Sequence, residues 1–315
     1  MKHSKGQAKG QPKPAAAALP STVTDIPEIR PGQSVALLQE LHILTRDGKL
    51  NQDSRRKLKQ VYHLYQFIEP LLNDVVNDKG AVSLVDHGAG KSYLGFILYD
   101  LFFKALQAQS PAQLPPTSHR GSHIYGIETR DELVQRSREL AAKFDFPGMS
   151  FLPLSVAEST TSAELPETVD IVTALHACNT ATDDAIDFAL KKHAKHIVLV
   201  PCCQAEVASV LRKNKGQSLG KSALTEIWRH PIHTREFGSQ VTNVLRCLQL
   251  EAHGYQVSVT ELVGWEHSMK NELIIATYKN LPRKRPAERL KEVLDTVGLQ
   301  EMGDRFYTEA EAAHD

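Results

Sequence analysis

The chain has 315 residues, which is enough for one large α/β domain with extensions but a tight fit for two complete domains. Lysines and arginines balance aspartates and glutamates, at 37 each, so no overall charge attracts the molecule to nucleic acid or to an anionic membrane. The four cysteines are too few for a disulfide framework, and the apolar runs are shorter than the roughly 20 residues of a membrane helix.

The N-terminal quarter of the chain divides into two regions of different composition. Residues 1–22 are mostly Lys, Gly, Gln, Pro and Ala, which predicts a disordered basic tail. Because this tail has no apolar segment of signal-peptide length, we expect a cytoplasmic protein. Residues 23–79 carry apolar positions at helical spacing with a polar break at 46–52, and they predict an N-terminal helical extension packed beside the main domain.

From Ala81 onward, short β-branched runs alternate with helical patterns, which is typical of βαβ units and a parallel sheet. The predicted fold class is therefore α/β, with a Rossmann-like seven-stranded sheet in residues 80–280. The expected strands are 82–86, 123–128, 149–155, 169–175, 196–200, 256–262 and 273–278, and the expected helices are 92–109, 130–144, 182–193 and 236–253. Residues 201–237 predict a long polar, partly irregular segment, and residues 281–315 a basic linker followed by a helix at 287–297.

The most informative motif is LVDHGAGKSYL, residues 84–94, at the end of the first predicted strand. Its two glycines allow a tight turn and close approach of the backbone to a ligand, and the helix that follows offers free N–H groups to an anion. A phosphate-binding P-loop would need glycine where Val85 stands, and a dinucleotide-binding loop would need glycine where Tyr93 stands. Both of these alternatives therefore fit the spacing poorly.

The pattern D-x-G-x-G-K-x-x-L, from Asp86 to Leu94, resembles the first motif of class I S-adenosylmethionine-dependent methyltransferases. The resemblance covers residues 80–280 and implies a methyltransferase domain with S-adenosyl-L-methionine as cofactor. It implies that the glycine loop lies under the methionine part of the donor, that Glu128 accepts both ribose hydroxyls, and that the residues after the third strand flank the adenine. The cofactor-binding residues implied in this way are Asp86, His87, Gly88, Ala89, Gly90, Ser92, Tyr93, Leu94, Glu128, Thr129, Ser155, Val156, Leu175 and His176.

Glu128 also has a simpler interpretation. An acidic residue is stabilising near a helix N-terminus, so this carboxylate could merely cap the helix that is expected to begin near Arg130. A carboxylate at the carboxyl end of a strand can equally accept two hydroxyl protons.

Three details resemble a subgroup of these enzymes, related to glutathione S-transferase C-terminal-domain-containing and tRNA 2′-O-methylating proteins. They are the loop DHGAGK at 86–91, the run LHAC at 175–178 with ATD at 181–183, and VPCC at 200–203. The second run usually reads H-x-C-G in that subgroup, and here Asn179 replaces the glycine.

The candidate catalytic residues are His176 and Asp183, which follow the fourth predicted strand. A histidine at the mouth of the sheet can hydrogen-bond donor or substrate, or take a proton from the acceptor, but it can equally anchor the loop in its neutral form. Asp183 has an ordinary alternative in helix-dipole stabilisation.

A zinc ion bound by His176, Cys178, Cys202 and Cys203 is a further alternative, because the loops after strands four and five are neighbours in this topology. Adjacent cysteines ligate one ion awkwardly, so we expect no metal. Buried cysteines beside strand ends are more often packing residues than nucleophiles.

The predicted acceptor is RNA, contacted through local basic segments, which would make the protein an RNA-modification enzyme. These segments are the N-terminal tail, residues 55–59 and residues 283–285. Residues 228–235 mix aromatic, cationic and imidazole groups, and they suit either stacking on a base or a structural lid. The alternatives are a small-molecule or protein methyltransferase with the same donor site, or a non-catalytic binding module. We expect no membrane partner.

Overall fold

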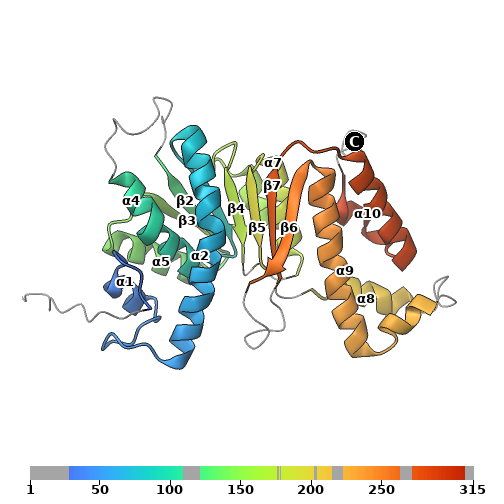
Figure 1. The fold of residues 1–315 in the computed structure, drawn as a ribbon, viewed down its shortest axis with the longest axis horizontal. Helices are drawn as coiled ribbons and strands as arrows, with labels where there is room; N and C mark the ends of the chain where they lie inside the picture. The colour runs from blue at the N-terminus through green and yellow to red at the C-terminus, as the bar shows by residue number, and fades with distance from the viewer. Residues whose placement is uncertain are drawn as a thin grey trace, which may run out of the picture. The chain divides into compact units, whose positions relative to one another are not determined.

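Seven strands form a single mixed sheet in the order β3-β2-β1-β4-β5-β7-β6 (Figure 1). The computed structural model describes residues 28–108, 121–175, 177, 179–201, 204–214, 223–262 and 272–308, so the predicted tail at 1–22 lies outside the described residues. The described residues from Ser34 onward group into one compact unit. The strands are β1 (Ser83–His87), β2 (His123–Ile127), β3 (Met149–Leu152), β4 (Ile171–Ala174), β5 (His196–Leu199), β6 (Tyr255–Glu261) and β7 (Glu272–Tyr278).

The sheet confirms the predicted α/β fold class and all seven predicted strands, with ends that differ from the prediction by up to three residues. Strands β1 to β5 pair in parallel, whereas β7 runs antiparallel between β5 and β6. Every residue of β4 and β5 is buried, which explains why these strands read as continuous apolar runs without alternation.

Helices cover both faces of the sheet (Figure 1). On one face α2 (Gln52–Lys79) packs against α3 (Tyr93–Leu98), and α7 (Ala181–Lys191) lies on the other. The predicted helix at 92–109 is α3 followed by a π-helical turn at Tyr99–Phe103 and by α4 (Lys104–Gln107). The remaining helices of this half are α1 (Val35–Glu40), α5 (Asp131–Lys143) and α6 (Val156–Thr161).

The N-terminal extension consists of α1 and α2, separated by the polar break that the sequence predicted. Helix α2 begins after Asn51, whose side chain accepts the backbone N–H of Ser54 at 2.8 Å, and ends at Gly80 in the left-handed conformation. One stripe of α2 is buried, as expected of an amphipathic helix on a sheet.

The C-terminal end of α2 is fixed to the start of the central strands. Asp74 hydrogen-bonds Nε2 of His196, the first residue of β5, at 2.9 Å, and Lys79 pairs with Asp170 at 2.5 Å, one residue before β4. The N-terminal end of α2 therefore lies toward the carboxyl ends of the parallel strands, here called the carboxyl edge of the sheet.

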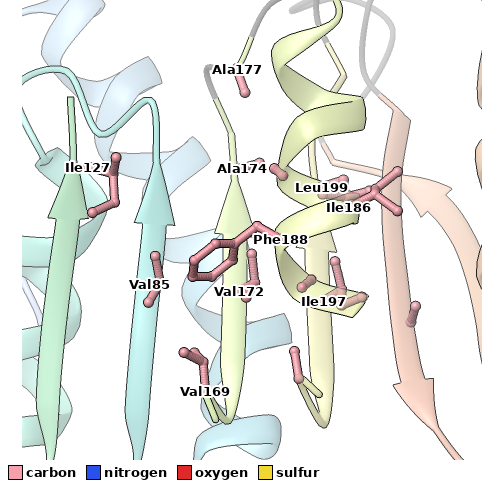
Figure 2. Packing of buried hydrophobic residues seen from close by; sticks show 14 of the residues in the cluster. Val85, Ile127, Val169, Val172, Ala174, Ala177, Ile186, Phe188, Ile197 and Leu199 are labelled. Atoms are coloured by element: carbon pink, nitrogen blue, oxygen red, sulfur yellow. The ribbon is translucent and has the colours of Figure 1, made fainter. Parts of the chain in front are cut away.

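The core between the sheet and α7 consists of branched and aromatic side chains. Figure 2 shows Phe188 of α7 projecting onto β1 and β4, close to Val85 and Val172. These three side chains have no exposed surface, and a buried phenylalanine of this kind contributes about 3–5 kcal/mol when judged by truncation to alanine.

A second hydrophobic core lies among the C-terminal helices, which include the helices predicted at 236–253 and 287–297. Within the segment predicted to be partly irregular, residues 206–213 form α8 and residues 223–228 form a 3₁₀ helix, and α9 (Pro231–Ala252) begins five residues earlier than expected. Helix α10 (Lys284–Val297) and a 3₁₀ helix at Gln300–Phe306 complete it. The buried residues of this helical lobe are Val207, Leu211, Trp228, Val241, Leu245, Leu248, Leu290, Leu294, Val297, Leu299, Met302 and Phe306.

None of the helices in the described ranges is both long and apolar enough to cross a lipid bilayer.

Close packing of α8 on α9 depends on Gly238. A β-carbon at this position would lie 2.8 Å from the backbone nitrogen of Ala208 and 2.9 Å from its Cα. We expect Gly238→Ala to lower the free energy of unfolding by about 1–3 kcal/mol, because overpacking outweighs the gain of about 1 kcal/mol in helix propensity. Urea denaturation measures this change.

The matched control is Gly303→Ala, because a β-carbon there meets no atom within 4 Å. This control should be neutral or slightly stabilising. Equal stability of the two variants would contradict close backbone packing between α8 and α9.

Candidate functional site

The loop between β1 and α3 turns tightly at the carboxyl end of the sheet. Gly88 and Gly90 have φ values of 65° and 57°, a region in which glycine alone is free of strain. The backbone N–H of Ala89 donates to the carbonyl of Ile127 in β2 at 3.0 Å, which holds the loop against the neighbouring strand. The motif therefore lies where the sequence predicted, between the first strand and its helix.

Glu128 follows β2 and joins this loop through its carboxylate. The side chain is buried, and Oε2 accepts the backbone N–H of Gly90 at 2.9 Å. Arg130 donates from its backbone N–H and from two guanidinium nitrogens, at 3.0–3.1 Å. Burial raises the pKa of Glu128, but the hydrogen bonds and charge of Arg130 and the Gly90 amide outweigh it and hold this pKa below its ordinary value. Glu128 is therefore anionic near neutral pH.

Asp86, in β1, lies in a different environment from that of Glu128. Its side chain is buried, and the hydroxyl of Thr173 in β4 donates to its Oδ1 at 2.6 Å. Desolvation raises the pKa of Asp86 to about 7, and the Thr173 hydrogen bond opposes this only in part. The pKa values of two acidic residues at the same edge of the sheet are thus shifted in opposite directions.

His87 and Ser92, both predicted to bind the cofactor, are buried in the protein. The His87 ring packs edge-to-face on Phe188 with centroids 4.5 Å apart, and burial lowers its pKa to about 3. Neither ring nitrogen of His87 nor the hydroxyl of Ser92 has a hydrogen-bond partner within the described part of the chain. The contact with Phe188 favours a packing role for His87, and the roles of His87 and Ser92 toward the cofactor stay predictions.

The other predicted cofactor residues line the same edge with varied exposure. Ser155 caps α6 in a capping box, since its hydroxyl accepts the N–H of Glu158 while its own N–H donates to that carboxylate. Val156 packs partly on the main core. Leu94, Ala89 and Leu175 are buried, Tyr93 is half-buried and Thr129 is exposed.

His176, the first catalytic candidate, lies outside the described residues, as do Cys178, Cys202 and Cys203. The catalytic role of His176 and the zinc alternative are therefore not tested by the structure. Among the residues that are described, no group of three or more His, Cys, Asp or Glu side chains is arranged to hold a metal ion.

Asp183, the second catalytic candidate, forms a buried ion pair with Arg246 of α9. The guanidinium Nε and a terminal nitrogen of Arg246 donate to the two carboxylate oxygens at 2.6 and 2.9 Å. Both side chains are at most 5% exposed. Because both oxygens of Asp183 are occupied by one guanidinium, this geometry favours a positioning role, and catalysis by Asp183 stays a prediction.

Arg246 extends this pair to the loops at the carboxyl edge. It also donates to the backbone carbonyl of Asn179, in the loop after β4, at 3.0 Å, and to the side chain of Asn243 at 3.3 Å. The side chain of Asn179 accepts the N–H of Ala205, in the segment after β5, at 3.2 Å. The buried pair thus connects α7 and α9 with two of the loops that border the site.

Sequence reasoning missed Arg246, Asn243 and Arg130. The polar residues Asn243, Arg246 and Gln249 recur every three positions within the mostly apolar run 243–250, and this pattern could have indicated a buried polar face. Arg130 lies two residues after Glu128, and that proximity was its only signal.

A known protein family matches the part of the chain that forms this edge of the sheet. Residues 56–210 match a family model described as a methyltransferase domain, and they include β1 to β5 with the glycine loop, Glu128 and Asp183. This part of the chain is a methyltransferase domain. The methyltransferase is an enzyme that uses S-adenosylmethionine as its methyl donor.

Solved structures resemble the methyltransferase at low sequence identity. Magnesium protoporphyrin IX methyltransferase from Synechocystis PCC 6803, with bound S-adenosylhomocysteine, is 15% identical over 78% of this chain and 96% of its own, with a TM-score of 0.41. Precorrin-6y C5,15-methyltransferase from Geobacter metallireducens GS-15 is 18% identical over 63% and 80%, with a TM-score of 0.33. An rRNA methylase from Streptococcus thermophilus is 9% identical over 69% and 95%, with a TM-score of 0.38. No curated protein matches the sequence.

The residues at this edge fit the donor. A β-carbon on Gly90 would point at the guanidinium of Arg130, 3.9 Å away, and at the carboxylate of Glu128, 4.0 Å away. The glycine therefore leaves room for a ligand beside the carboxylate, whose lone pairs are occupied in the free protein by Gly90 and Arg130. A bound donor supplies an electrophilic methyl group.

The raised pKa of Asp86 predicts a pH-dependent stability. Between about pH 4 and pH 7 the folded protein keeps the Asp86 proton while the unfolded chain has lost it, so this group makes the folded state less stable as pH rises. The comparison is the free energy of unfolding of Asp86→Asn minus that of the unsubstituted protein. We expect this difference to rise by about 2–4 kcal/mol from about pH 4 to about pH 7 and to level off above about pH 7. Urea denaturation at several pH values measures the difference. A difference that stays constant with pH would show that Asp86 is ionised throughout.

The buried pair predicts a large cost for removing one partner. Asp183→Ala leaves Arg246 buried and unpaired, so we expect a loss of about 3–5 kcal/mol in the free energy of unfolding. The double variant Asp183→Leu with Arg246→Met should recover most of this loss, because it removes both charges. Thermal and urea denaturation measure both effects.

The control is Arg235→Ala on the same helix, whose ion pair with Glu236 is exposed and contributes less than about 1 kcal/mol. If Asp183→Ala were as stable as this control but inactive, Asp183 would be catalytic and its positioning role would be refuted.

Proposed function

We propose that the methyltransferase acts on RNA, with Glu128 holding the ribose hydroxyls of the donor. The observation that carries the RNA proposal is a run of exposed cations at the start of α2: Arg55, Arg56, Lys57 and Lys59. Asp53 is the acidic residue of that turn, and it lies 3.8 Å from Arg56. This segment, the basic end of α2, thus carries a local excess of positive charge in a chain that is neutral overall.

The direction of α2 supports a role near the site. Its far end is tied to the residue before β4 and to the first residue of β5, and its 28 residues extend about 42 Å, more than twice the length of those strands. In Figure 1 the start of α2 reaches beyond the ends of the parallel strands, on the side toward which they run. An RNA held there by its phosphates would lie next to the edge that carries the glycine loop.

Residues 228–235 give this proposal less support than their composition suggested. Trp228 is only 2% exposed and stacks on Phe237 at 4.8 Å inside the helical lobe, so its ring is not free to stack on a base. These contacts favour the structural alternative for Trp228. His230, Ile232 and His233 are exposed at the start of α9.

The chemistry expected of this chain is positioning. Glu128 and the glycine loop would hold the donor, and the buried pair of Asp183 and Arg246 would fix the loop after β4 that frames the acceptor. His176 would accept the proton of the acceptor group, as a loop histidine can do.

The test is transfer of labelled methyl from S-adenosylmethionine to fractionated cellular RNA, protein and metabolites. We expect label in RNA. The triple variant Arg56→Glu, Lys57→Glu and Lys59→Glu should weaken RNA binding by roughly tenfold or more. The slope of log K against log salt concentration should correspond to about three fewer released counterions. The affinity for the methyl donor should not change.

The control reverses two exposed cations of α10, Arg289 and Lys291, which lie outside the basic segments predicted to contact RNA. It should leave RNA binding within about twofold. Label found only in protein or metabolites, or a loss caused by the α10 variant and not by the α2 variant, would contradict the proposal.

A further inference from the structure

The carboxylate of Glu128 has no capacity left for a new hydrogen bond. A carboxylate has about four lone-pair sites. Oε1 accepts the backbone N–H and Nε of Arg130 at 3.1 and 3.0 Å, and Oε2 accepts the N–H of Gly90 and a guanidinium nitrogen of Arg130 at 2.9 and 3.1 Å. The Thr129 hydroxyl lies at 3.4 Å from Oε1 in addition. Two ribose hydroxyls can therefore bind only if two of these donors leave.

The donors that can leave are the two guanidinium nitrogens of Arg130. The N–H groups of Gly90 and Arg130 belong to the backbone of the loop and of the residue that precedes α5, and the loop is held to Ile127. The side chain of Arg130 is 60% exposed, whereas that of Glu128 is 9% exposed. The guanidinium can therefore swing into water, where it keeps its hydration, while the carboxylate stays in place.

We propose that Arg130 is a latch on the donor site, which closes on Glu128 in the free enzyme and opens when the donor ribose binds. Binding then exchanges two charged hydrogen bonds from arginine for two from ribose hydroxyls, with the carboxylate anionic in both states. The latch lowers donor affinity, and it shields a buried charge until the ligand arrives. This inference rests on the proposed ribose contact of Glu128.

The experiment is calorimetric titration of the full-length protein with S-adenosylmethionine and with S-adenosylhomocysteine. We expect Arg130→Ala to bind both ligands about threefold to tenfold more tightly, because an exposed bidentate ion pair no longer competes. The difference should narrow as salt rises from about 0.05 to 0.5 M, because screening weakens the latch in the unsubstituted protein. Melting temperatures verify that each variant is folded.

Two matched variants and one ligand distinguish the latch from a general effect of charge near the site. Arg136→Ala removes an exposed cation of the same helix that does not contact Glu128, and it should leave both affinities within about twofold. In a protein that already carries Glu128→Ala, Arg130→Ala should not increase the affinity for either ligand, because no carboxylate remains for Arg130 to release. A 2′,3′-dideoxy analogue of S-adenosylhomocysteine should show no gain either, because it lacks the hydroxyls that compete with Arg130.

Weaker or unchanged binding in Arg130→Ala would overturn the proposal, because Arg130 would then orient Glu128 or contact the donor. A gain for S-adenosylmethionine alone would also overturn it, since the sulfonium is the charge that the homocysteine product lacks. If Glu128→Ala itself binds both ligands normally, the ribose contact fails, and with it the basis of the latch. If Glu128→Ala weakens binding but Arg130→Ala does not tighten it, the latch alone fails.

Discussion

A guanidinium with almost no access to water holds the carboxyl edge of this methyltransferase together. Arg246 is among the largest fully buried side chains, and a charge in that position is tolerated only because Asp183 and the Asn179 carbonyl surround it. These partners come from α7 and from the loop after β4, and Arg246 comes from α9. The pair therefore fixes the relative positions of three segments far apart in the sequence, which determines where the loops around the acceptor begin.

The donor side and the acceptor side of the site depend on contacts that differ in how far apart the residues lie in the sequence. On the donor side, Glu128, Arg130 and Gly90 are joined through adjacent strand ends and a turn, so short segments are enough to form the carboxylate site. On the acceptor side, the connections run from α7 to α9 and from the loop after β4 to the segment after β5. A change in the donor half therefore stays local, whereas a change at Asp183 or Arg246 affects the folded state as a whole.

The same difference in range explains what the sequence could predict. The strands were recognisable because buried parallel strands are short β-branched runs, and the glycine loop was recognisable because its spacing reflects a turn with positive φ. Helix α8 was missed because eight residues give little periodic signal. The early start of α9 was missed because residues 231–235, which contain a single large apolar side chain, show no helical spacing of apolar positions. The partners of Glu128 and Asp183 could not be predicted, since pairing depends on which side chains the fold brings together.

The C-terminal residues supply much of the buried core of the helical lobe, although their composition is strongly polar. Residues 281–315 were predicted as a basic linker followed by a helix, and six of the twelve buried side chains of the lobe lie there, between Leu290 and Phe306. Their partners include Leu245 and Leu248 of α9, the helix that also carries Arg246. A shortened enzyme ending near residue 281 would thus expose an apolar face of α9 to water. Aggregation of such a fragment would reflect the loss of this second core, while the Rossmann-like sheet itself would keep all seven strands.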